Sequence, residues 1–158
     1  MRFTLIKNVK QDKAMKPLLN SLLVFIFLYI IFDIFVKSHT MGLTSSQVNT
    51  TLFGNADEFL DPMNKSVFLE FVHMQIFFLM MLLLTLSAVF IRLLHQKRST
   101  LLVMNLLMIF GLLCPVSLMV SYFYAPEFTT IYLFAFFTWH IVGFYMTLAS
   151  FWELNIAK

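Results

Sequence analysis

The fold is decided by residues 67–94, which read VFLEFVHMQIFFLMMLLLTLSAVFIRLL. The only ionisable side chains in this stretch are Glu70, His73 and Arg92. A helix needs about 20 mainly apolar residues to cross the ~30 Å hydrocarbon core of a bilayer, and this segment is long enough to do so. It therefore predicts a transmembrane helix.

One further apolar segment of similar length precedes it, at about residues 17–36, and two follow it, at about residues 101–124 and 131–152. Short polar connections between the last three segments favour antiparallel neighbours. The sequence therefore predicts an all-α integral membrane protein, an antiparallel four-transmembrane-helix bundle. In this interpretation residues 1–16 are a basic cytoplasmic segment, and residues 17–158 form a single transmembrane domain with an outer loop at 37–66.

The composition excludes a water-soluble domain. Hydrophobic residues make up 60% of the chain and charged residues only 12%, whereas soluble domains carry about a quarter charged residues. The net charge of +3 comes from basic residues that flank the spans rather than lining a groove, so no nucleic-acid partner is expected. The lone cysteine, Cys114, allows no disulfide within the chain.

The distribution of lysine and arginine predicts how the chain is oriented. Loops on the cytoplasmic side of a membrane are enriched in these residues. With the N-terminus inside, only Lys37 and Lys65 fall outside, and the remaining basic residues fall inside: Arg2, Lys7, Lys10, Lys13, Lys16, Arg92, Lys97, Arg98 and Lys158. Both termini are therefore expected in the cytoplasm, with a bacterial inner membrane as the expected location.

The predicted outer loop contains two helix-start signals. Thr44, followed by two serines, can cap a short amphipathic helix that Gly54 would end. Asp61 and Pro62 have the residue types of an N-cap and a first helical position, so the second long helix is expected to start there.

Four ionisable side chains within the spans are the candidate functional residues: Asp33 in the first, Glu70 and His73 in the second, and His140 in the fourth. Such groups are costly in lipid unless they are paired or face a wet interior, and they often mark functional sites. Counted at about 1.5 Å per residue, all four lie in the outer half of the membrane.

One hypothesis is a b-type haem held between His73 and His140 for membrane electron transfer. The second and fourth helices would lie diagonally across an up-down bundle, so a histidine from each could reach a central iron. Gly143, three residues after His140, would leave room for the porphyrin edge. The arrangement resembles the way in which membrane b-type cytochromes suspend haem between diagonal helices.

A second hypothesis is a single transition metal bound by His73, His140, Glu70 and Asp33, since imidazole and carboxylate suit several such metals. Glu70 and His73 have the spacing of one half of a helical di-metal motif. Phe137 stands where the matching acid of the fourth span would be, which argues against a di-iron centre.

The alternative is a non-catalytic accessory or assembly subunit, in which the same polar residues tie helices together by hydrogen bonds. Under either function the expected partners are the lipid bilayer and other membrane subunits or further copies of the chain. The sequence leaves these hypotheses open, and it contains no nucleotide-binding or hydrolase motif.

Overall fold

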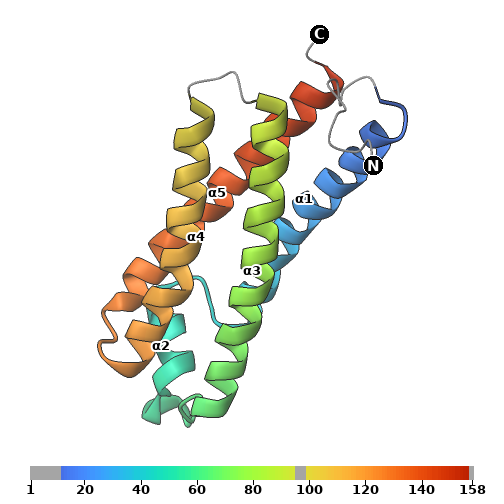
Figure 1. Cartoon of the computed structure of the whole chain (residues 1–158). Coiled ribbons are helices and arrows are strands. Elements are labelled where there is room, and N and C mark those ends of the chain that lie inside the picture. The colour runs from blue at the N-terminus through green and yellow to red at the C-terminus, as the bar shows by residue number, and fades with distance from the viewer. Residues whose placement is uncertain (1–11, 95–98, 157–158) are drawn as a thin grey trace.

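The computed structural model describes residues 12–94 and 99–156. The described chain is helical, with four long helices and two short ones (Figure 1). In chain order these are α1 (Met15–Thr40), α2 (Ser45–Phe53), the 3-10 helix η2 (Ala56–Glu58), α3 (Lys65–Leu94), α4 (Ser99–Phe123) and α5 (Phe128–Asn155).

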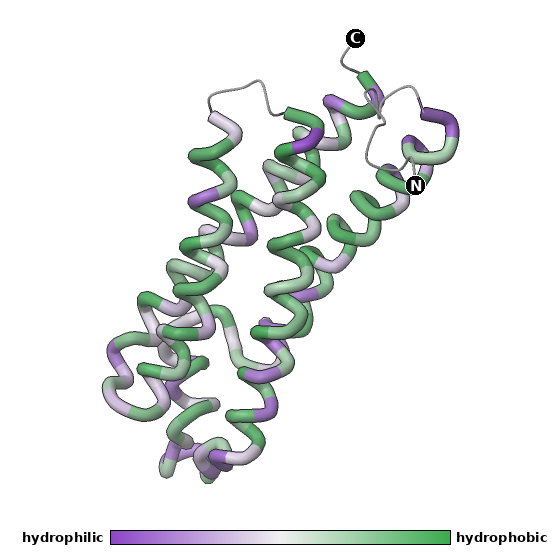
Figure 2. Tube along the Cα trace, viewed as in Figure 1, coloured by the Kyte–Doolittle hydropathy of each residue, from purple (hydrophilic) through white to green (hydrophobic). Residues whose placement is uncertain are grey.

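The four long helices are each long and apolar enough to cross a membrane. Hydrophobic residues dominate their middle parts, and hydrophilic residues concentrate near their ends (Figure 2). This confirms the predicted class, an all-α integral membrane protein with four transmembrane helices. Most of the predicted basic segment, as well as the α3–α4 turn at 95–98, lies outside the described residues.

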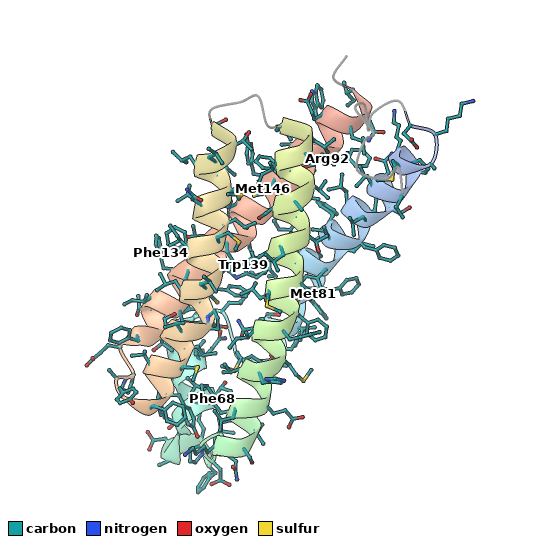
Figure 3. The ribbon with its side chains drawn as sticks, in the orientation of Figure 1. Phe68, Met81, Arg92, Phe134, Trp139 and Met146 are labelled. Carbon is teal, nitrogen blue, oxygen red and sulfur yellow. The ribbon has the colours of Figure 1, made fainter. Side chains whose placement is uncertain are left out.

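The last helix, α5, occupies the centre of the molecule. It packs against α1, α2, α3 and α4, most extensively against α4 (Figure 1). Helix α1 packs more extensively against α5 than against α3. Trp139 and Met146 of α5 are buried in the interior (Figure 3). The expectation that the second and fourth spans would face each other diagonally therefore does not hold, because α3 and α5 are packed directly together.

The first and last helices are joined at one end of the bundle. The side-chain amides of Asn20 and Asn155 hydrogen-bond to each other in both directions, over 3.1 and 2.7 Å. The end of α3 and the start of α4 lie at the same end, and α2 lies at the opposite end (Figure 1). The start of α1 and the end of α5 are thus on one side of the membrane, as an even number of spans requires.

The short helix predicted after Thr44 is present as α2. The Thr44 side chain accepts a hydrogen bond from the Gln47 amide at 3.3 Å, and Gly54 ends the helix with a positive φ of 77°. Val48 and Leu52 are buried, and Asn49 Oδ1 accepts a hydrogen bond of 2.7 Å from Thr129 of α5. The loop that contains α2 is therefore anchored to the bundle.

The start of α3 differs from the expectation that Asp61 would cap it. The helix begins at Lys65, and the Asn64 side chain accepts a hydrogen bond from the Ser66 amide at 3.0 Å. The preceding residues are held in another conformation, since the Met63 amide donates to the Leu52 carbonyl at 3.1 Å. Tertiary contacts with α2 thus move the helix start past Pro62.

Candidate functional site

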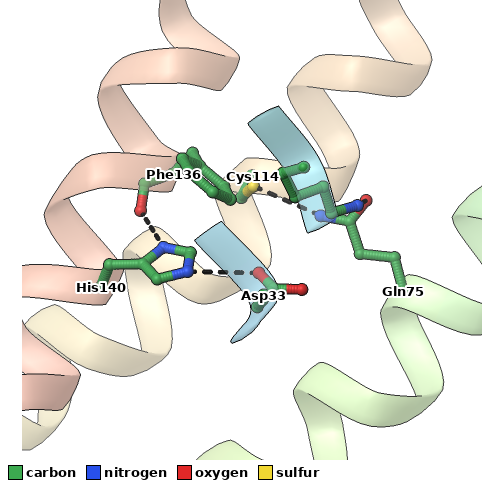
Figure 4. A network of polar contacts seen from close by, with 6 residues as sticks. Asp33, Gln75, Cys114, Phe136 and His140 are labelled. Carbon is green, nitrogen blue, oxygen red and sulfur yellow. Dashed lines mark hydrogen bonds and ion pairs between the residues drawn. The ribbon is translucent and has the colours of Figure 1, made fainter. Parts of the chain in front are cut away.

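A contact between two ionisable side chains joins α1 to α5. Asp33 Oδ2 lies 3.2 Å from His140 Nε2 (Figure 4). The His140 side chain is 2% exposed and the Asp33 side chain 17%. The contact has the distance of an ion pair, but it misses the alignment of a good hydrogen bond.

The imidazole of His140 is held from several sides. Its Nδ1 lies 2.7 Å from the carbonyl oxygen of Phe136, one turn earlier in α5. The rings of Trp139 and Phe136 lie against it, with centroid distances of 3.6 and 4.1 Å. The ring orientation is therefore fixed by residues of its own helix.

These contacts determine which ring nitrogen of His140 faces Asp33. A carbonyl oxygen can only accept, so Nδ1 is the nitrogen that donates to the Phe136 carbonyl. Nε2 is therefore the nitrogen that lies against the Asp33 carboxyl. Each side chain gives the other a polar neighbour, which offsets part of the cost of burial in an apolar bundle.

A second set of polar contacts joins α1, α3 and α4. Lys37 Nζ donates to Gln75 Oε1 at 3.0 Å and lies 3.7 Å from the centre of the Phe71 ring. Gln75 Nε2 in turn lies 3.6 Å from Cys114 Sγ. Lys37 is only 5% exposed, so its ammonium depends on the amide oxygen and the aromatic ring in place of water.

Together these side chains form one polar cluster, which we define as Asp33, Lys37, Gln75, Cys114 and His140 (Figure 4). Asp33 and Lys37 are one turn apart on α1 and so project from the same face of that helix. The cluster draws on α1, α3, α4 and α5, and thus links all four membrane-spanning helices.

The remaining predicted ligands lie elsewhere. Glu70 and His73 are exposed on α3, whereas His140 is buried beside Asp33. Among residues 12–94 and 99–156, no group of three or more His, Cys, Asp or Glu side chains is close enough to hold a metal ion. The structure thus brings together two of the four predicted ligands, and the haem and single-metal hypotheses stay predictions.

Gly143, which was expected to leave room for a porphyrin edge, is in contact with α1. A Cβ atom added to Gly143 would lie 3.2 Å from Ile30 Cδ1 and 3.8 Å from Leu107 Cδ1. The missing side chain therefore allows α1 and α4 to approach α5 closely.

Sequence reasoning missed three members of the cluster, since Cys114 was considered only as a possible disulfide partner. Lys37 was assigned to the outer loop, although α1 continues to Thr40, and Gln75 was not considered at all. Lys37 follows Asp33 by four residues, and Gln75 is an uncharged polar residue within an apolar span. Both are signals that could have indicated a buried polar contact.

Comparison with known protein families gave one match. The model of a family described as a transmembrane helical domain matches residues 42–158, from the loop before α2 to the last residue of the sequence. No curated protein and no solved structure matches the chain.

Proposed function

Because the chain belongs to the Aq_1264_TM family of transmembrane helical domains, we propose that it is a non-catalytic accessory subunit that acts by lateral association within the membrane. In this proposal the polar cluster holds the four spans in one arrangement. The observation that carries it is the state of His140, both of whose ring nitrogens face groups of the same chain, the Phe136 carbonyl and the Asp33 carboxyl.

The pattern of contacts in the cluster supports a structural role. Asp33 faces His140, Lys37 donates to Gln75, and Gln75 contacts Cys114. Interhelical polar contacts of this kind stabilise helix association in lipid. An apolar groove lies between α1 and α3, and a polar pocket lies at the outer end of α1. Neither is lined by a side chain of the polar cluster.

The competing proposal is membrane electron transfer through a haem, or binding of a single metal, near the outer face. It draws on His140, which is buried among aromatic rings, as haem ligands often are. It also requires His73 to turn from the exposed side of α3 toward His140 and Ile30 to leave the space beside Gly143. Because cofactor binding needs both of these rearrangements, we favour the structural role.

The deciding experiment is an absorption spectrum and a metal analysis of the purified full-length chain, produced with an adequate supply of haem and iron. We expect no Soret band and less than one metal ion per ten chains, for the unsubstituted protein as well as for His140→Ala. A Soret band or a bound metal that is lost in His140→Ala or His73→Ala would overturn the proposal in favour of cofactor binding.

The orientation belongs to the same proposal. The distribution of lysine and arginine residues supports an orientation with both termini in the cytoplasm and α2 on the outer side. The location that we propose is a bacterial inner membrane.

A further inference from the structure

One narrow stripe of exposed side chains runs along α4. Its members are separated by three or four residues in alternation, and we call them the α4 stripe: Leu102, Asn105, Ile109, Leu112 and Val116. The four aliphatic members are each more than half exposed. Alternating intervals of three and four residues give the 3.5-residue period by which two helices pack knobs into holes.

The opposite face of α4 has the same kind of spacing and is already occupied. Leu107, Gly111, Cys114 and Leu118 are buried, and the side chain of Leu83 from α3 fills the space beside Gly111. The helix thus has two faces suited to helix packing, and residues 12–94 and 99–156 cover one of them. Helix α4 lies at the edge of the bundle away from α1 (Figure 1), and the exposed side chains of the α4 stripe are open to a second molecule.

Asn105 is the unusual member of the stripe. It stands six residues after the first residue of α4, about 9 Å along the helix axis, and so at hydrocarbon depth. Its side chain is exposed and makes no hydrogen bond with any of residues 12–94 and 99–156. An amide that faces hydrocarbon without a partner is costly, so this residue needs a polar partner that the described residues do not supply.

We infer that α4 is a homodimerisation helix, in which the Asn105 amides of two copies hydrogen-bond across a two-fold axis perpendicular to the membrane. A side-chain amide is both donor and acceptor, so the same residue from two copies can form a reciprocal pair. Two-fold symmetry brings identical residues together in this way and keeps both copies in the same membrane orientation.

The aliphatic members of the stripe complete the interface. Leu102, Ile109 and Leu112 would interdigitate with their counterparts on either side of the asparagine pair, and a single polar residue in such a seam fixes its register. The inference rests on the proposed function of lateral association and names its partner as a second copy of this chain.

The first test is disulfide cross-linking of the full-length chain in native membranes. Cys114→Ser provides a background without cysteine, and Ile109→Cys places a thiol on the stripe. Ile141→Cys, on the exposed face of α5 and 68% exposed, is the matched control. We expect mild oxidation to give covalent dimers with Ile109→Cys and few with Ile141→Cys, and equal cross-linking at both positions would overturn the inference.

The second test measures dimer dissociation in lipid nanodiscs or mild detergent by energy transfer between labelled chains. We expect Asn105→Leu to weaken the dimer about tenfold, since interhelical polar contacts contribute modestly in lipid. Asn105→Gln, which keeps the amide, should retain the dimer within about threefold. A monomeric unsubstituted chain, or a dimer unaffected by Asn105→Leu, would overturn the inference.

The two proposals fail separately. Asn105→Leu leaves His140 and Asp33 unchanged, so the absorption spectrum and metal content report on the proposed function whatever the oligomeric state. A colourless, metal-free monomer would overturn the dimer alone, and a haem-containing dimer would overturn the non-catalytic role alone.

Discussion

Asp33 and His140 belong to the first and last helices of the chain, and their side chains meet inside the bundle with 3.2 Å between Oδ2 and Nε2. Most residues of α1 are not buried in the protein. The contact connects this helix to the central helix α5. Each side chain thus gives the other a polar neighbour, which offsets part of the cost of burying it in the membrane interior.

Replacing one member of this pair should cost more than replacing both. Asp33→Leu leaves a buried imidazole nitrogen unpaired and His140→Phe leaves the carboxyl unpaired, so each should lower the free energy of unfolding by roughly 1–3 kcal/mol. The double variant should lose less than the sum, because neither polar group remains. Thermal unfolding in detergent measures all three, with Phe137→Leu on the exposed face of α5 as control. Additive losses would contradict the pairing.

The contact between Lys37 and Gln75 predicts a rescue. Gln75→Leu removes the oxygen that accepts from the Lys37 ammonium at 3.0 Å, and it should destabilise the chain by about 1–3 kcal/mol. Lys37→Met added to this variant should recover most of the loss, since it removes the buried charge while keeping the length of the side chain. Titration with a denaturing detergent gives the comparison, and a double variant as unstable as Gln75→Leu alone would speak against the contact.

The packing at Gly143 should be sensitive to side-chain size. Gly143→Ala places Cβ 3.2 Å from Ile30 Cδ1, which a small shift of the isoleucine can relieve. Gly143→Leu cannot be accommodated so easily, and we expect a loss of about 1–3 kcal/mol from overpacking. Ile30→Ala combined with Gly143→Leu should restore part of it. Melting temperatures in detergent measure the series, and a Gly143→Leu variant as stable as the parent would show that α1 does not pack closely here.

The cap of α2 should determine how often this short helix opens. Thr44→Ala removes the acceptor for the Gln47 amide and should cost α2 about 1 kcal/mol. Hydrogen exchange followed by mass spectrometry should then show faster exchange in residues 45–53, with α4 and α5 unaffected. Thr44→Ser keeps the hydroxyl and should exchange like the parent chain. Equal protection in the alanine variant would mean that burial of Leu52 and Val48 alone holds α2.

The orientation can be tested with single cysteines in a Cys114→Ser background. Glu58→Cys, in η2 at the α2 end of the molecule, should react with a membrane-impermeant thiol reagent added to intact cells. Lys13→Cys, before α1, should react only after the membrane is permeabilised, because lysine and arginine concentrate on the cytoplasmic side. Labelling of Lys13→Cys in intact cells would reverse the proposed orientation.

The amino-acid sequence determined the class of fold because length and hydrophobicity are local properties. Segments such as 67–94 must be helical in lipid, where every backbone polar group needs a partner within its own segment. Local capping also predicted α2, since Thr44 and Gly54 act on adjacent residues. The predicted start of α3 was wrong because the backbone of Met63 hydrogen-bonds to that of Leu52, and these residues are not neighbours in the sequence.

Which polar residues meet was decided only by the tertiary structure. The sequence predicted Asp33, Glu70, His73 and His140 in the outer half of the membrane, but depth along a helix does not determine which way a helix face turns. The rotation of α3 leaves Glu70 and His73 exposed while bringing Gln75 to Lys37, and the central position of α5 brings His140 to Asp33. The rotation of each helix and the choice of its neighbours depend on how side chains such as Ile30 fit beside Gly143. Such a fit joins segments that are far apart in the sequence, so the periodicity of neither segment predicts it.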